Sequence, residues 1–517
     1  MPANRGVAAN RDKINDDRRW PAAPLKTRQI DVTGSLVAEI ETPVSAQAAQ
    51  TAAYQRNPYP SFIHPLTHPD RLATIARLSG LDAPDIGTAR VLEVGVGDGL
   101  NLLSMAQALP DASFVGFDIE AEGIGRGRER VAAVGQGNVR LEVADLMNGA
   151  PEIDGSFDYI IAHGVFAWVP EPVALALLAL IGERLAPNGV AFVSFNALPG
   201  SYATQAVREA MMRAAGNAEN AEERLERARA LLRAIAEPRG NDGQVQKGLR
   251  IVARERLERD ARVLVHDELS TSWHPWHLSD VLDRSREHGL MFLGDASAEL
   301  VVDGILMDQA PAPAPALQQF VEARACADDD LAFRQFRRLL LTRDDALPRR
   351  HVDPRVIEGL FAASYAEEVE PETFAAGPRR IRCDHPPLRD ALRRLIAASP
   401  ERIPVRDLGL NDAYLRALIG LFDYEMLSLH TVPTSCSPTV RQRPKASPLA
   451  RVMVSEGMDW AATLDHRVVA LDAGAKEVLA MLDGSTERED VYARLSGRGF
   501  DGEAAVAGLA GIALLTR

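Results

Sequence analysis

Five short apolar runs, the last four each followed by a polar residue, divide the chain between residues 89 and 196. The runs cover residues 89–94, 113–117, 139–144, 157–162 and 190–195. Their length is typical of buried parallel strands. Apolar residues at helical spacing lie between the runs, most clearly at 121–134 and 172–185. This alternation of strands and helices predicts an α/β fold with a doubly wound parallel sheet.

Polar side chains stand at the ends of the later strands. Asp118, Asp145, His163 and Asn196 each come directly after an apolar run. In a doubly wound sheet the carboxyl ends of the parallel strands meet along one edge, and ligands bind in the crevice there. The sequence therefore predicts a binding site that these four residues share.

A glycine-rich loop follows the first strand. Gly95, Gly97 and Gly99 alternate with other residues, which lets the backbone pass close to a ligand, and a helix is predicted to begin near Leu100. The dinucleotide fingerprint G-x-G-x-x-G places its third glycine one position later, so hydride transfer is disfavoured. Asp118 lies about 20 positions beyond the loop, where an acidic residue binds ribose hydroxyls.

The loop resembles motif I of class I S-adenosylmethionine (SAM) methyltransferases in its pattern Glu93-x-Gly95-x-Gly97-x-Gly99. The resemblance implies a Rossmann-like methyltransferase sheet with SAM as the cofactor. It also implies that Asp118 accepts both ribose hydroxyls and that Asp145, with Leu146, holds the adenine. The implied cofactor site consists of Glu93, Gly95, Gly97, Asp98, Gly99, Asn101, Asp118, Ile119, Asp145, Leu146, His163 and Gly164.

An aromatic segment, HGVFAWVP at residues 163–170, follows the fourth strand, where this class of enzyme faces the transferred methyl group. A desolvated aromatic pocket favours a neutral lysine amine, whose ordinary pKa is about 10.4, and tolerates the charged product through cation–π contacts. His163 is also a candidate proton acceptor through water; the alternative is a histidine that only closes the strand end. The candidates for the substrate pocket are His163, Phe166, Trp168, Tyr59 and Tyr202.

Several short motifs together resemble the bacterial methyltransferases that carry a methyltransferase regulatory domain. The earlier motifs are Tyr59-Pro60, His68-Pro69-x-Arg71-Leu72 and Asn196-x-Leu198-Pro199-Gly200. The later ones are HDEL at 266–269, Trp273-x-Pro275, GLMFLGDA at 289–296, Phe333-Arg334-x-Phe336-Arg337 and SPLAR at 447–451. The characterised members of that family are rickettsial lysine methyltransferases of outer-membrane proteins. The resemblance therefore implies a lysine nitrogen of a protein or peptide as the methyl acceptor.

Two other functions use the same motifs. A small-molecule or natural-product methyltransferase would share the cofactor site, and a SAM-binding sensor would bind the cofactor without transferring a methyl group. Methyl transfer needs alignment of the reacting atoms rather than a nucleophilic triad, so the residues alone do not name the acceptor.

The length of 517 residues predicts about three domains or more. Polar composition predicts a tail without stable structure at 1–45, followed by the SAM-binding core at 46–205. A helical regulatory or insertion domain is predicted at 206–306, with a strand at 289–294 that returns to the sheet. An α-helical domain is predicted at 307–435, after a proline-alanine connector, with helices at 317–327, 331–342, 354–365 and 387–398.

Residues 436–517 resemble a small PqqD-like winged-helix module that holds peptides. Ser485-Thr486-x-x-Glu489 is predicted to be a capping box. The segments after Met307 are predicted to hold a protein acceptor, so that a chain ending there, if it folds, would keep SAM affinity, lose transfer to a protein and retain slow transfer to a short lysine peptide. The alternative is that these segments only stabilise the core or form a homodimer.

The net charge of −14 argues against a nucleic acid as the substrate and favours a basic protein. The sequence shows neither a long apolar run nor a signal peptide, and the scattered residues Cys326, Cys383 and Cys436 form no disulfide framework. We therefore expect a cytoplasmic protein without membrane insertion. Pro275 interrupts the pair His274-x-x-His277, so no metal site is expected.

Overall fold

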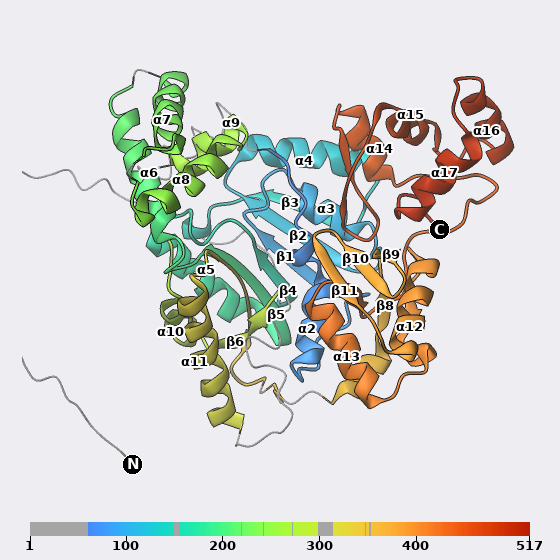
Figure 1. Cartoon of the computed structure of the whole chain (residues 1–517), viewed down its shortest axis with the longest axis horizontal. Helices are drawn as coiled ribbons and strands as arrows, with labels where there is room; N and C mark the ends of the chain where they lie inside the picture. Colours follow the sequence, from blue (N-terminus) through green and yellow to red (C-terminus); the bar gives the residue numbers. More distant parts are fainter. Residues whose placement is uncertain are drawn as a thin grey trace, which may run out of the picture. The chain divides into compact units, whose positions relative to one another are not determined.

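The structure is a computed structural model (Figure 1). It describes residues 60–148, 155–218, 220–240, 242–270, 272–297, 314–346, 348–350 and 353–517. The predicted tail at 1–45, Tyr59 and most of the proline-alanine connector lie outside the described residues.

A seven-stranded sheet forms the centre of the fold, in the order β3-β2-β1-β4-β5-β7-β6. The five predicted strands are all present and run parallel to one another. They are β1 Arg90–Val94, β2 Ser113–Asp118, β3 Val139–Val143, β4 Phe157–Ala162 and β5 Leu185–Asn196. β1, β4 and β5 are almost wholly buried because helices cover both faces of the sheet, which explains their near-continuous apolar sequences.

Two further strands extend the sheet beyond β5. β6, Leu290–Asp295, confirms the predicted returning strand, and β7, Phe336–Arg343, runs antiparallel between β5 and β6. The helix predicted at 331–342 is therefore wrong for most of its length. Leu339, Leu340 and Leu341 are all fully buried, because β7 pairs with a strand on each side and its side chains pack on both faces of the sheet. The apolar run therefore reflects a buried strand and not one face of a helix.

Helices flank the sheet, and local caps set their ends. α4, Ala121–Val134, begins where the Glu120 carboxylate accepts the N–H groups of Glu122 and Gly123 at 2.9 and 2.5 Å, and it ends at Gly135, whose φ is +74°. The other flanking helices are α2 Pro69–Leu78, α3 Leu100–Ala106, α5 Glu171–Arg184, α10 Leu278–Arg286 and α11 Ala314–Ala332.

The predicted helical insertion is confirmed. Its elements are α6 Tyr202–Ala215, α7 Ala221–Ala236, α8 Gln244–Leu257, α9 Ala261–Val263 and the π-helical turn η3 Leu264–Glu268. They pack around an apolar cluster of their own that includes Val207, Met211 and Leu232.

The region after β7 mixes helices with small sheets. Helix α12, Pro386–Ala398, matches its prediction, but the helix predicted at 354–365 is a 3₁₀ turn, η4 Pro354–Gly359, followed by strand β8. The strands are β8 Phe361–Ala363, β9 Glu367–Glu370, β10 Thr373–Ala376, β11 Arg379–Arg382, β12 Ile403–Pro404 and β13 Ser428–His430. The remaining turns and helix are η1 Pro65–Thr67, η2 Leu146–Asn148, η5 Val405–Leu408 and α13 Asp412–Asp423.

The C-terminal unit consists of four helices and a two-stranded sheet. Its elements are α14 Pro448–Ser455, β14 Trp460–Ala462, β15 Val468–Ala470, α15 Ala473–Met481, α16 Arg488–Ser496 and α17 Gly502–Gly511. The capping box is wrong, because Ser485 bonds Asp483 within the turn and α16 begins only at Arg488. Leu449 and Met453 of α14 pack against Leu103 of α3 and Ile63, so this unit reaches the glycine-loop helix.

None of the helices in the described part of the chain has the length and apolarity that a bilayer crossing requires. Within the same residues, no three His, Cys, Asp or Glu side chains converge in a way that could hold a metal ion.

Candidate active site

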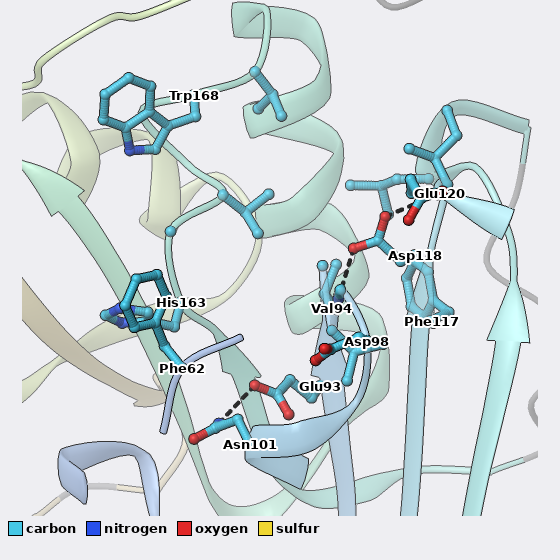
Figure 2. A pocket seen from close by; sticks show the side chains of 18 of the residues that line it. Phe62, Glu93, Val94, Asp98, Asn101, Phe117, Asp118, Glu120, His163 and Trp168 are labelled. Atoms are coloured by element: carbon cyan, nitrogen blue, oxygen red, sulfur yellow. Dashed lines mark hydrogen bonds between the residues drawn. The ribbon is translucent and has the colours of Figure 1, made fainter. Parts of the chain in front are cut away.

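A pocket of about 310 Å³ opens at the carboxyl edge of the sheet, beside the ends of β1, β2 and β4 (Figure 2). Every predicted cofactor-binding residue except Gly99 lines it. Residues 60–64, which precede η1, form another part of the wall, and Asp267 reaches the pocket from the helical insertion. The structure thus brings the strand-end residues together as the sequence predicted, apart from Asn196.

The glycine loop leaves open space at one position and packs tightly at another. Gly95, Gly97 and Gly99 all have left-handed backbones, with φ of +71°, +57° and +71°. A Cβ added at Gly97 would meet no atom within 4 Å, whereas one at Gly99 would lie 2.7 Å from a methyl carbon of Leu141. Gly97 therefore forms an open cradle, and Gly99 serves the packing of the loop against β3.

Asp118 ties the glycine loop to the end of β2 (Figure 2). Its Oδ2 accepts the N–H of Gly97 at 2.9 Å, and its Oδ1 accepts the N–H of Glu120 at 2.9 Å. Burial raises the pKa of this carboxyl. Each oxygen keeps a lone pair, so the ribose contacts expected of Asp118 stay a prediction that this geometry allows.

Glu93 has one carboxyl oxygen without a partner. Oε1 accepts the Asn101 amide at 2.8 Å, while the buried Oε2 has no hydrogen-bond partner among the described residues (Figure 2). Burial raises the pKa of Glu93 to about 8, so the carboxyl is mostly protonated at neutral pH. Asn101 also accepts the N–H of His64 at 2.8 Å, which links Glu93 to residues 60–64.

Asp98 connects the glycine loop with the C-terminal unit. The Ser61 hydroxyl donates to its carboxylate, and Arg130 Nη1 donates to the same oxygen at 2.5 Å. Arg130 also donates from Nε to the Glu456 carboxylate at 2.9 Å. Because the Arg130 side chain is only 9% exposed, the ion pair between Arg130 and Asp98 is little screened by solvent.

Two neutral imidazoles lie side by side at the end of β4. The ring centroids of His64 and His163 are 3.6 Å apart. Burial lowers the pKa of His64 to about 4 and the pKa of His163 well below its usual value. His163 also contacts Ser194, whose Oγ lies 3.2 Å from its Nδ1 and accepts the N–H of Gly164. Both rings are therefore uncharged at neutral pH.

The predicted aromatic wall is only partly present. Trp168 lines the pocket, with its ring 6.2 Å from that of Trp273. The prediction that Phe166 lines the pocket is wrong. Its side chain is fully buried and packs against Phe195 and Trp276 in the core, so it does not reach the pocket. Tyr202 is exposed on α6 beside His277 and does not line the pocket.

Asp145 lies in the pocket next to Leu146, as predicted. Its carboxylate accepts the Met147 N–H at 2.9 Å and the Asn148 amide at 2.8 Å, which closes the turn η2. Its contact with adenine stays a prediction.

Among the lining residues that sequence reasoning missed are Ser61, Phe62, His64 and Asp267. The first three follow the sequence Asn57-Pro58-Tyr59-Pro60, and that proline-rich motif is the signal that could have found them. Asp267 lay inside a recognised motif, but only the folded insertion brings it to the sheet edge.

The lining fits SAM on two observations. The unpartnered Glu93 oxygen suits a cationic donor such as the cofactor's ammonium group, whose charge would favour the ionised carboxylate, and Gly97 leaves room above the loop for a ligand. Together with the parallel sheet, its antiparallel strand β7 and the acidic end of β2, this site defines a class I SAM-dependent methyltransferase.

Family models match three parts of the chain. Residues 91–189 match a methyltransferase domain, and residues 260–343 match a predicted methyltransferase regulatory domain. Residues 442–512 match the C-terminal winged helix domain of PKMT.

Two proteins of Rickettsia prowazekii are similar to parts of this chain. The uncharacterized protein RP028 of Rickettsia prowazekii is 36% identical over 183 residues, 35% of this chain and 73% of RP028. RP789 of the same organism is 27% identical over 301 residues; the match spans 58% of this chain and about half, 54%, of RP789. The chain belongs to the SAM-dependent methyltransferases that carry a methyltransferase regulatory domain.

The fold is shared with PKMT2 from Rickettsia typhi. The two superpose with a TM-score of 0.75 at 22% identity, over 88% of this chain and 100% of PKMT2. PKMT2 has also been solved in complex with AdoHcy, with the same TM-score.

Proposed function

We propose that this methyltransferase transfers the methyl group of SAM to a lysine side-chain nitrogen of a protein or peptide. The observation that carries the proposal is a pocket whose charges are mainly negative and whose imidazoles are neutral. The charged and ionisable groups of its lining, besides the two histidines, are Glu93, Asp98, Asp118, Glu120, Arg126, Asp145 and Asp267. Such a lining attracts a cationic cofactor and a cationic acceptor, and it repels an acceptor rich in carboxylates or phosphates.

Glu93, Asp118 and Gly97 would hold the cofactor at the glycine loop. SAM supplies a methyl group on a positively charged sulfur, which leaves as a neutral thioether when a nucleophile attacks. The task of the protein is then to align the acceptor and to keep water out. Residues 60–64 close one side of the pocket and would help to keep water out.

A lysine must lose its proton before it can attack. The ordinary pKa of its ammonium group is about 10.4, and an uncharged, desolvated wall lowers it. His64, His163 and Trp168 form such a wall. Because burial lowers the pKa of both imidazoles, they stay neutral, and the proton of the ammonium group would leave to water before the acceptor is enclosed. Asp267, from the regulatory segment, lies where it would attract the ammonium form on arrival.

Two comparisons support a protein acceptor over a small molecule. The C-terminal unit matches a domain named for PKMT, and the whole described fold follows PKMT2. The net charge of −14 also favours a basic protein.

The test is transfer from radiolabelled SAM to a cell extract that is separated into macromolecular and small-molecule fractions before counting. A lysine peptide and the same peptide with acetylated lysine provide the defined acceptors. We expect label in the protein fraction and in the free lysine peptide only. Trp168→Leu should reduce transfer to the peptide, whereas Glu142→Gln, an exposed residue of β3 outside the pocket, should not.

Label confined to the small-molecule fraction would replace the lysine proposal by the small-molecule alternative. Normal SAM binding with label in neither fraction would favour a sensor.

A further inference from the structure

A second cavity has a volume of about 360 Å³. It is enclosed by α2 and η1, by strand β13 with the turn before it, and by the turn between β14 and β15. Its volume is in the range of small-molecule sites. Residues 65–71 line it, and they directly continue residues 60–64 of the methyltransferase pocket.

Asp70, the most buried carboxylate of the second cavity, is already saturated. Asp70 accepts bonds from the Thr431 N–H at 2.6 Å, the Thr431 hydroxyl at 2.8 Å and His430 Nδ1 at 2.7 Å, and it also pairs with Arg402. Since a carboxylate has about four acceptor positions, Asp70 has none left for a ligand.

Of the other two carboxylates, Asp465 uses both of its oxygens within the protein, whereas the partly exposed Glu425 uses one. Asp465 accepts the Tyr365 hydroxyl at 2.6 Å and Arg467 Nε at 2.9 Å, and it also accepts the Thr463 hydroxyl. Glu425 pairs with Arg379. The buried carboxylates of the lining therefore serve the protein itself.

The guanidinium groups, by contrast, keep unused donors. Arg71 donates only from Nε, to the main-chain oxygen of Ala296 at 2.9 Å; it lies 4.3 Å above the Phe422 ring and forms no ion pair with the described carboxylates. Burial lowers its pKa to about 10, so it remains charged at neutral pH. Arg402 uses Nη1 for all its side-chain bonds to described residues.

Two more groups of the lining, Arg467 and His68, also have unused hydrogen-bond donors. The buried Nη2 of Arg467 has no partner in the described ranges. His68 accepts the Asp70 N–H at its Nδ1, at 3.1 Å, and burial lowers its pKa to about 4, so its neutral ring carries the proton on Nε2 as a donor. What remains for a ligand is a set of donors, most of them charged.

We propose that the second cavity binds a small anion through carboxylate or phosphate oxygens, with Arg71, Arg402 and Arg467 as its charge partners. A buried guanidinium with unused N–H groups is costly, and an anion with acceptor oxygens compensates for that cost. A ligand held there would touch residues 65–71 and would restrain the segment that also walls the methyltransferase pocket.

Calorimetry of the full-length protein tests the proposal with inorganic phosphate and succinate as probes, at an ionic strength matched with sodium chloride. We expect saturable binding of at least one probe, and the stronger probe tells phosphate from carboxylate chemistry. Arg71→Met keeps the side-chain stem over Phe422 and removes the charge, so it should weaken binding by about tenfold or more.

Arg90→Met is the matched control. Arg90 also lies over a phenylalanine ring, Phe157 at 4.8 Å, and also donates to a main-chain oxygen, that of Ser156, but it is outside the cavity. The Arg90→Met protein should bind the probes with the same affinity as the wild type. If Arg71→Met does not fold, Arg467→Gln replaces it, because Asp465 keeps the Tyr365 and Thr463 donors.

The proposal fails if neither probe binds beyond the sodium chloride control at millimolar concentration. It also fails if the cavity variants bind as tightly as Arg90→Met. The measurement involves no methyl transfer, so its outcome is independent of the acceptor of the enzyme.

Discussion

One continuous segment, residues 60–71, contributes to the methyltransferase pocket and to the second cavity described above, and these two cavities differ in the groups that they leave unused. At the sheet edge the unused group is a carboxyl oxygen, the buried Oε2 of Glu93, which becomes an acceptor when a cationic ligand stabilises the ionised form. In the second cavity the unused groups are donors, among them Nη2 of Arg467. A count of charges would not reveal this difference, since both linings contain acidic and basic side chains.

The comparison shows that internal partners decide which ligand a polar cavity can take. Asp70 and Asp118 are both buried aspartates at the edge of a cavity. Asp70 is saturated by four donors, whereas Asp118 accepts two main-chain N–H groups and keeps capacity for two more bonds. The first aspartate is therefore structural, and the second is able to serve a ligand.

The largest effect should come from removing the acceptor at Asp118. Loss of two charge-assisted bonds, roughly 1.5–3 kcal/mol each, predicts that Asp118→Ala weakens SAM binding by more than about a hundredfold. Phosphate binding to the second cavity should not change. Calorimetry with both ligands checks this, and near-normal SAM affinity in the variant would remove Asp118 from the cofactor site.

A pair of glycine variants separates binding from packing at the same loop. Gly97→Val would fill open space and strain a left-handed backbone, so SAM affinity should fall about tenfold or more. Gly99→Val would meet Leu141 instead, so its main effect should be a lower melting temperature. Equal effects of the two variants on affinity and on melting would contradict this division.

Sequence patterns alone were sufficient to place the strand-end residues Asp118, Asp145 and His163 at the first cavity. Each strand-end residue that lines it, such as Asp118 or His163, follows a buried run whose length and composition mark a parallel strand. The glycine spacing then separated this site from a dinucleotide site. Local rules worked here because each strand carries its ligand-facing residue at its own end.

The far edge of the sheet could not be predicted in this way. β7 has a run of leucines that favours a helix locally, and only its pairing with β5 and β6 makes it a strand. The same pairing bears on the prediction for a chain ending near Met307, which holds only if that chain folds: it would lack β7 and leave β6 without its partner in the sheet. The second cavity was equally invisible, since its residues come from segments more than 300 positions apart, as the bond of Asp70 to His430 illustrates.

The protonation of Glu93 gives a smaller, pH-dependent effect. The folded protein holds this proton up to about pH 8, whereas an unfolded glutamate, with an ordinary pKa of about 4.5, releases it earlier. Raising the pH through this window therefore favours unfolding and lowers the free energy of unfolding. Between pH 6.5 and 8 the loss should be about 1–2 kcal/mol.

Urea denaturation of the wild type and of Glu93→Gln at both pH values measures this loss. The glutamine still accepts the Asn101 amide, so the difference between the two proteins isolates the titration of Glu93. The window begins at the pKa of an unfolded histidine, about 6.5, so the buried imidazoles contribute with the opposite sign, but they contribute equally to both proteins and cancel in the difference. A wild type and variant with equal pH dependence would show that Glu93 is already ionised in the fold.

The smallest effect should appear at His466, which contacts the shared segment from the C-terminal unit. Its Nε2 donates to the main-chain oxygen of His64 at 3.2 Å, and its Nδ1 accepts the Ser104 hydroxyl at 2.8 Å. His466→Asn tolerates the left-handed backbone at this position, φ +60°, but is too short to keep both bonds. Because residues 60–64 face SAM and His466 itself lines the second cavity, the affinities for SAM and for phosphate should both fall, by about threefold each. His385→Ala, outside both cavities, is the control. A variant that loses affinity for one ligand only would show that the segment does not couple the two cavities, and each would then have to be treated as a separate site.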